Sequence, residues 1–329
     1  MLYPLKFKPL LKERIWGGRA LNTAMGKRLP EGVKIGESWE ISAVPGDISV
    51  VANGKLRGND LRELTEVYMG ELVGERVFER FGLDFPLLIK LIDAQDVLSV
   101  QVHPNDELAE KRHDSFGKTE MWYVVGCEPG ASLYVGFRPG VTREKYLAAV
   151  SNDTLPELLN KIDVKPGDAF FIPAGTIHAI GRGLLIAEIQ QTSDITYRVY
   201  DWGRVDDNGQ PRQLHTELAV DAIDFGAGAG AGAGGNLHVD RPARAGEAVT
   251  LVECPYFTTN VIALDGRLAR DYSRLDSFVI YMCLEGEFSI VGVDGAAEKV
   301  HRGDSVLLPA EESEVTLDGR ARLLEVYIK

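Results

Sequence analysis

The strongest indication of architecture is the stretch Gly167-Asp168-Ala169-Phe170-Phe171-Ile172-Pro173-Ala174-Gly175-Thr176-Ile177-His178. It combines a Gly-Asp turn, four mostly apolar residues typical of a β-strand, and a Pro-Gly turn that leads to a histidine. A similar unit follows at Arg302-Gly303-Asp304-Ser305-Val306-Leu307-Leu308-Pro309. A unit repeated at this separation favours two related β-domains. A common turn-strand-turn, used twice, would give the same pattern.

A second strand carries two polar residues that share a face. In Ser99-Val100-Gln101-Val102-His103, side-chain direction alternates, so Gln101 and His103 project together, opposite the two valines. Pro104 ends the strand because it cannot continue the hydrogen-bond ladder. An amide oxygen and an imidazole nitrogen on one strand are half of a possible metal site.

Two segments interrupt the β-pattern. Apolar residues at approximately helical spacing between Leu61 and Phe81 predict a helical segment at about 60–81. A second helical segment is predicted at about 141–162. Its second half starts with Thr154-Leu155-Pro156-Glu157, whose hydroxyl and carboxylate match a capping box.

A tract of glycine and alanine at 226–235 divides the chain. It has almost no side chain to bury and therefore predicts a linker or surface loop. We accordingly expect a catalytic domain at 1–235 and a second β-domain at 236–329. After Pro309 the second repeat continues with Ala310-Glu311-Glu312-Ser313-Glu314, which contains no histidine. The second domain is therefore expected to lack metal ligands and to be structural.

Composition narrows the possible functions. The 329 residues are 45% hydrophobic and 26% charged, which is ordinary for a soluble globular protein. No apolar run approaches a membrane span and no signal-peptide pattern is present, so we expect a cytoplasmic protein. The net charge of −13 argues against nucleic-acid binding, and an anionic substrate would need a local group of cations. The three scattered cysteines indicate buried thiols rather than disulfides.

The stretch from Gly167 to His178 resembles the second motif of the cupin superfamily, with Arg182 where an asparagine is usual. More of the chain resembles the type I mannose-6-phosphate isomerases, in their short bacterial form. Four motifs in order carry this resemblance: Gln101–Asp106, Gly117–Tyr123, Pro173–Ala179 and Ser193–Arg204. The resemblance implies a mainly β fold of two cupin-like barrels, or jelly rolls, with a helical insertion.

The same resemblance implies one Zn²⁺ per chain. Its ligands would be Gln101, His103, Glu120 and His178. Two imidazoles, a carboxylate and an amide oxygen suit zinc at roughly 2.0–2.2 Å and leave room for water or substrate. Only the carboxylate is charged, so the loaded site would keep a positive charge that polarises hydroxyl or carbonyl oxygens.

The activity implied is the interconversion of mannose 6-phosphate and fructose 6-phosphate through a cis-enediolate. Arg198 matches the position usually given the catalytic role, and a guanidinium, which stays protonated, suits an enediolate or a phosphate. Lys118 lies two residues before Glu120 on the same face, where an adjacent metal would lower its pKa. The group that takes the C2 proton remains open. Further pocket residues would be Ser99, Glu188 and Asp194.

Two other functions use the same kind of pocket. A cupin oxygenase would hold Fe²⁺ and depend on dioxygen, and a non-catalytic sugar-binding cupin would bind its ligand without turnover. The presence of Lys118 and Arg198 argues against the second.

The expected partner is a sugar phosphate, with no nucleic acid and no membrane, and the protein is expected to be a monomer or a homodimer.

Overall fold

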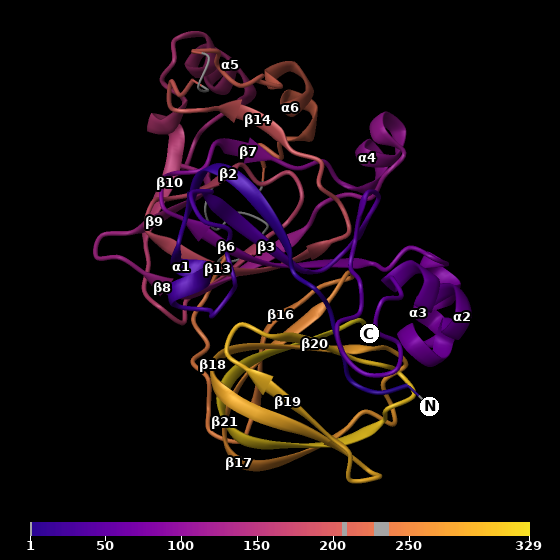
Figure 1. Cartoon of the computed structure of the whole chain (residues 1–329). Helices are drawn as coiled ribbons and strands as arrows, with labels where there is room; N and C mark the ends of the chain where they lie inside the picture. The colour runs from indigo at the N-terminus through magenta and orange to yellow at the C-terminus, as the bar shows by residue number, and fades with distance from the viewer. Residues whose placement is uncertain (1, 206–208, 227–236) are drawn as a thin grey trace.

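The structure is a computed structural model that describes residues 2–205, 209–226 and 237–329. Antiparallel strands form two barrel-shaped bodies, one above the other in Figure 1. The upper body holds most of the N-terminal part of the chain, and the lower one, coloured orange to yellow, holds the C-terminal part. The predicted mainly β fold is confirmed.

Two sheets form the upper barrel. The order of the first is β15 (His238–Val239), β11 (Ala169–Ile172), β8 (Glu120–Cys127), β13 (Leu184–Gln191), β6 (Leu87–Ala94), β3 (Ile35–Ile41) and β2 (Leu10–Gly18). The order of the second is β10 (Leu159–Asp163), β9 (Ser132–Phe137), β12 (His178–Ile180), β7 (Val100–Val102) and β14 (Tyr197–Tyr200). Apolar side chains from both sheets, such as Trp122 and Leu133, form a common core.

One sheet forms the lower barrel. Its order is β1 (Leu5–Lys6), β20 (Ser305–Leu308), β18 (Val279–Gly292), β21 (Glu314–Tyr327), β17 (Thr258–Asp271) and β16 (Ala248–Glu253), and β19 (Ala297–His301) also pairs with β18. The interior is apolar, with Ile262 and Leu317 fully buried. A larger apolar core, which includes Met121 and Phe278, joins the two barrels.

Strand pairing crosses the predicted domain boundary in both directions. Strand β1 lies near the N-terminus but pairs with β20 of the lower barrel, and β15 follows the predicted linker but pairs with β11 of the upper barrel. Most of the predicted linker, residues 227–235, lies outside the described residues. The division into 1–235 and 236–329 therefore stays a prediction. Within the described residues, no helix is long and apolar enough to cross a membrane.

The predicted helical segment at 60–81 consists of α2 (Leu61–Val73) and α3 (Glu75–Phe81). Asp60 caps α2: its carboxylate accepts from the Glu63 amide, and the Glu63 carboxylate accepts from the Asp60 amide. Gly74 separates the helices with a φ of 95°. A Cβ at this position would lie 2.4 Å from the Asp276 carbonyl oxygen, so only glycine fits between α2 and the lower barrel.

The predicted helical segment at 141–162 is wrong in its second half. Helix α5 (Arg143–Ser151) and the 3-10 turn η1 (Leu155–Leu158) are followed by strand β10, which pairs with the edge of β9. Pairing with β9 supplies the backbone hydrogen bonds that a helix would otherwise provide. The Thr154 side chain makes no capping bond among the described residues, because its ψ of 14° departs from the extended conformation of an N-cap.

The remaining elements are short. They are α1 (Ala20–Thr23), β4 (Ala43–Val44), β5 (Asp47–Ile48), α4 (Asp106–His113) and α6 (Thr216–Ala222). Helices α5 and α6 lie at the top of the upper barrel, and α2 and α3 lie beside the junction of the barrels (Figure 1).

The two capping sequences give a matched test of stability. Because Asp60 makes both bonds of a capping box, Asp60→Ala is expected to lower the free energy of unfolding by about 1 kcal/mol. Thr154→Ala removes no capping bond and is expected to cost less than about 0.5 kcal/mol. Urea unfolding of both variants measures the difference. Equal losses would contradict the assignment of the caps.

Candidate metal centre and adjoining pocket

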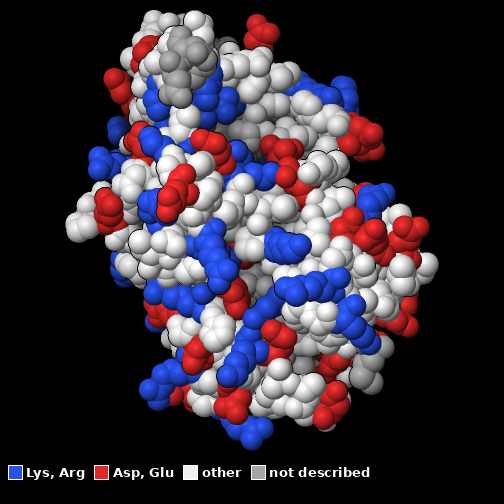
Figure 2. Space-filling view, in the orientation of Figure 1, with Lys and Arg blue, Asp and Glu red and all other residues white. Residues whose placement is uncertain are grey.

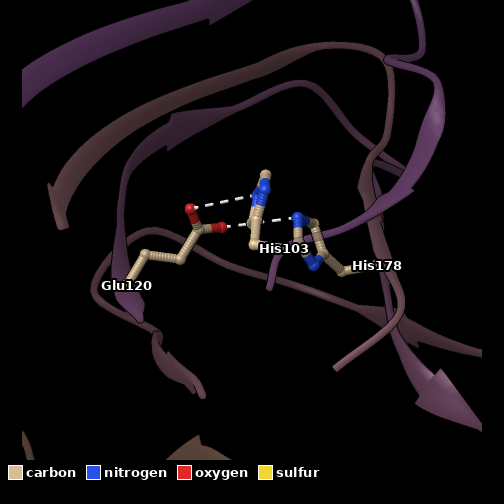
Figure 3. A group of neighbouring side chains, drawn as sticks. All are labelled: His103, Glu120 and His178. Atoms are coloured by element: carbon tan, nitrogen blue, oxygen red, sulfur yellow. Dashed lines mark ion pairs between the residues drawn. The ribbon is translucent and has the colours of Figure 1, made fainter. Parts of the chain in front are cut away.

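Three buried side chains from different strands meet inside the upper barrel (Figure 3). Glu120 begins β8, His178 begins β12, and His103 follows the last residue of β7. His103 Nε2 lies 3.5 Å from Glu120 Oε2, and His178 Nε2 lies 3.4 Å from Glu120 Oε1. The exposed fractions of His103, Glu120 and His178 are 1%, 0% and 0%. The cluster is thus shielded from bulk water.

Both imidazoles are oriented by the backbone. Nδ1 of His103 lies 2.8 Å from the Ile195 carbonyl oxygen, and Nδ1 of His178 lies 2.8 Å from the Thr176 carbonyl oxygen. These carbonyls can only accept, so each Nδ1 carries the proton and each Nε2 turns a lone pair toward Glu120. Burial and the charge of Lys118 lower the pKa of His178 to about 4 and that of His103 well below its ordinary value. Both rings are therefore neutral, as metal ligation requires.

Gln101 reaches the same cluster through strand register. Strand β7 lies between β12 and β14, and Gln101 pairs with His178 on one side and with Arg198 on the other. The amide nitrogen of Gln101 lies 3.2 Å from His178 Nε2. A half-turn of the amide exchanges its oxygen and nitrogen, which would turn Oε1 to this position. All four residues predicted as metal ligands are therefore neighbours.

The donor set fits a divalent cation. Glu120 Oε1 is buried and accepts no hydrogen bond from any described residue. Burying a polar atom without a hydrogen-bond partner costs free energy, because the atom loses its bonds to water and gains none in return. Two imidazole nitrogens, a carboxylate and an amide can supply four ligand atoms around a point between the rings. A cation at this point would give Glu120 its missing partner.

Lys118 also belongs to the cluster. Its Nζ donates to Glu120 Oε2 at 2.6 Å and lies 3.0 Å from His103 Nε2. Burial lowers the pKa of Lys118, but the carboxylates of Glu120 and Glu188 raise it by more, so the net direction is upward. An adjacent metal was expected to lower the pKa of Lys118, whereas the neighbouring carboxylates raise it. They therefore favour the charged ammonium form of the side chain.

A cavity of about 300 Å³ adjoins the cluster. Every predicted catalytic and substrate-binding residue lines it, together with one predicted ligand: Ser99, Gln101, Lys118, Glu188, Asp194 and Arg198. Its wall holds five cationic side chains and three carboxylates. Positive side chains therefore outnumber negative ones in the cavity. A chain with a net charge of −13 needs such a local excess to bind an anionic substrate. Figure 2 shows positive and negative side chains interspersed over the visible face.

Sequence reasoning missed four charged residues of this cavity: Arg14, Glu37, Lys90 and Arg212. Each stands alone in the sequence, outside the four motifs. Arg14 donates to Glu37 through Nε at 2.9 Å, and Arg212 donates to Asp201 through Nε at 2.7 Å. Lys90 interrupts an otherwise apolar run in β6, but this signal does not reveal that β2, β3 and β6 adjoin the motifs.

Glu188 is held by two partners in the cavity wall. Oε1 accepts from Lys90 Nζ at 2.9 Å, and Oε2 accepts from Trp122 Nε1 at 2.9 Å. Burial raises the pKa of Glu188, but Lys90 and Lys118 lower it by more, so the carboxylate stays ionised. The Trp122 ring in turn packs edge-on against His178, with 5.2 Å between centroids. Glu188 is thereby linked to the metal cluster.

Arg198 lines the cavity. Its Nη1 donates to the Gln213 carbonyl at 3.0 Å, while its buried Nε has no hydrogen-bond partner among the described residues. Burial, together with Arg212, lowers the pKa of Arg198. Ser99 is buried close by, and Asp194 is exposed at the rim. The remaining histidines lie outside the cluster, as predicted: His113, His215, His238 and His301.

Comparison with known proteins shows the family of the chain. Residues 4–121 match the phosphomannose isomerase type I catalytic domain, and residues 247–328 match the mannose-6-phosphate isomerase cupin domain. A mannose-6-phosphate isomerase of Bacillus subtilis is 37% identical over 99% of each chain. The chain belongs to the type I mannose-6-phosphate isomerase family.

Other members of this family are similar over their whole length. A mannose-6-phosphate isomerase of Streptococcus mutans is 36% identical over 98% of each chain. The crystal structure of a mannose 6-phosphate isomerase from Bacillus subtilis superposes with a TM-score of 0.87 at 34% identity, over 99% of this chain and 100% of that one. The cupin fold expected for the chain is confirmed.

The cluster predicts how metal content responds to substitution. His178→Ala removes a ligand atom and leaves Glu120 with one imidazole fewer, so we expect at least a tenfold loss of affinity for divalent metal. His301→Ala changes a surface histidine and is the matched control. Elemental analysis after dialysis against a weak chelator measures both. Equal metal content in the two variants would contradict the assignment.

Proposed function

We propose that the protein interconverts mannose 6-phosphate and fructose 6-phosphate with one Zn²⁺ per chain, held by Gln101, His103, Glu120 and His178. Membership of the isomerase family supports the reaction. The observation that supports the metal is Glu120 Oε1, a buried oxygen that accepts no hydrogen bond from the described residues and lies 3.4 Å from His178 Nε2. Nitrogen and oxygen donors in this number suit zinc.

The reaction needs no oxidant or reductant. In the aldose-to-ketose direction the C2 proton leaves, a cis-enediolate forms, and a proton is delivered to C1, so C2 is oxidised while C1 is reduced. A zinc ion, when bound, supplies a positive charge that polarises a hydroxyl or carbonyl oxygen. The chain must then stabilise the enediolate and move protons.

In our proposal two cationic residues stabilise the negative charge and move the proton between the two oxygens, and the group that takes the C2 proton and returns one to C1 is not assigned. Arg198 stabilises the negative charge of the enediolate or of the phosphate, because it lines the cavity and a guanidinium stays protonated. Lys118 transfers a proton between the oxygens on C2 and C1: as an ammonium it can donate to the carbonyl oxygen and then recover a proton from the neighbouring hydroxyl. The position of Nζ beside His103 and Glu120 supports this role.

The other cavity residues bind the substrate. The Ser99 hydroxyl and the Asp194 carboxylate can bond to sugar hydroxyls. Glu188 keeps Lys90 and Trp122 in place and adds negative charge near Lys118.

Because the substrate in this proposal is a charged sugar phosphate, we expect the enzyme to act in the cytoplasm. A monomer or homodimer remains our expectation for the assembly, and sedimentation would test it.

Arg198→Ala tests the proposed activity. We expect kcat to fall by about 10²–10³-fold, the usual effect of removing one donor from a developing oxyanion. Arg182→Ala, an exposed arginine near the end of β12, is the control and should leave kcat unchanged. A coupled assay that follows fructose 6-phosphate measures both variants. Near-normal turnover by Arg198→Ala would contradict the role of the arginine.

The same assay separates the isomerase from its alternatives. An isomerase retains full activity without dioxygen and loses it when the metal is removed by a chelator. Activity that requires dioxygen would favour the Fe²⁺ oxygenase, and sugar binding without turnover would favour a non-catalytic cupin.

A further inference from the structure

Asp106 ends the motif that contains Gln101 and His103, but it does not line the catalytic cavity. It is the first residue of α4, and its carboxylate is the acceptor of three hydrogen bonds. Oδ1 accepts from the Gly117 amide at 2.8 Å and from Gln191 Nε2 at 2.8 Å. Oδ2 accepts from the Tyr256 hydroxyl at 2.7 Å. One carboxylate thus joins α4, the loop before β8, the end of β13 and a segment of the C-terminal half.

These bonds fix the backbone on both sides of Lys118. Asp106 holds the amide of Gly117, and Gln191 Oε1 accepts from the Thr119 amide at 2.8 Å. The amide of Lys118 itself donates to the Pro104 carbonyl at 3.1 Å. Three successive amides are therefore bonded, and the Lys118 side chain leaves the backbone from a fixed point.

The contact between this loop and α4 is close enough to require glycine. A Cβ on Gly117 would lie 2.6 Å from the Asp106 backbone nitrogen and 2.7 Å from the Asn105 carbonyl carbon. Backbone atoms cannot move aside as the end of a flexible side chain can. The loop before Lys118 therefore packs directly on the start of α4, where Asp106 can reach it.

Tyr256 connects this loop to the lower barrel. It lies in the short connection between β16 and β17, both strands of that barrel. Burial and the bond to Asp106 raise the pKa of Tyr256 to about 12, so the hydroxyl keeps its proton and donates to the carboxylate. The lower barrel, which contributes no residue to the metal cluster, thus bonds to the residue that holds the Lys118 loop.

We propose that Asp106, Gln191 and Tyr256 form a clamp that positions Lys118 for proton transfer, so that the lower barrel takes part in catalysis from outside the cavity. This inference rests on the role proposed for Lys118. The three are positioning residues, since none touches the reacting atoms. Glu120 is held separately by the pairing of β8 with β11 and β13. Loosening the clamp therefore displaces Lys118 and leaves the metal ligands in place.

Tyr256→Phe tests the clamp with the smallest change, because it removes one hydroxyl and keeps the ring. We expect kcat to fall about threefold to tenfold, the range that corresponds to the net contribution of one ordinary hydrogen bond. KM and the metal content of one ion per chain should stay unchanged. Tyr327→Phe is the matched control, since it removes a hydroxyl from the same barrel without contact to Asp106, and its kcat should equal that of the wild type.

Asp106 provides a second pair of variants. Asp106→Ala removes all three bonds and should lower kcat by about 100-fold, because a misplacement of 1 Å costs this much. Asp106→Asn keeps the shape and one acceptor oxygen, and should recover most of the activity. If Asp106→Ala does not fold, Tyr256→Phe and Asp106→Asn decide the question.

Two results would overturn the clamp. One is a kcat of Tyr256→Phe equal to that of Tyr327→Phe in an active wild-type preparation. The other is a fall in kcat that follows a loss of bound metal, which would indicate a structural defect of the ligand cluster. An inactive but metal-loaded wild type would instead contradict the proposed function, so the two failures are distinguishable.

Discussion

The carboxylate of Glu120 has no access to water, and burial raises its pKa to about 7 although the charge of Lys118 lowers it, so its negative charge must be compensated within the protein. A buried ion without a partner costs several kcal/mol. Lys118 bonds to one carboxylate oxygen, while the other oxygen faces the Nε2 atom of His178 and receives no hydrogen bond from the described residues. Burial, the carboxylate oxygen without a hydrogen bond and the backbone-oriented imidazoles together make this point suitable for a cation. The polar cluster is tolerated in an apolar barrel because its members neutralise one another.

Strand register brings these members together. Placing β7 between β12 and β14 sets Gln101 beside both His178 and Arg198, and the facing sheet contributes Glu120 and Glu188. Each of the two facing sheets therefore contributes both ligands and cationic residues. The second barrel has no such cluster among its described residues, but it pairs with β1, contacts the start of α3, and reaches the Lys118 loop through Tyr256. These contacts join it to the first barrel and to the loop that carries Lys118.

Local patterns were sufficient to predict much of this site. The period-two alternation around Gln101 and the turn before His178 each depend on only a few adjacent residues. The strands form where these patterns predict them. Features that depend on distant neighbours were not predictable. The segment at Leu159–Asp163 became a strand because the edge of β9 was open to it, and Arg14 and Lys90 entered the cavity because β2 and β6 extend the same sheet. The upward pKa of Lys118 likewise depends on Glu188, 70 residues away in the sequence.

We propose that one metal ion lies between the imidazoles and gives Glu120 its missing partner. Anomalous diffraction at the zinc absorption edge, from crystals of active protein, would locate this ion. The account predicts a single peak at roughly 2.0–2.2 Å from Gln101 Oε1, His103 Nε2, a carboxylate oxygen of Glu120 and His178 Nε2. A peak elsewhere, or fully active crystals with no metal between His103 and His178, would contradict it.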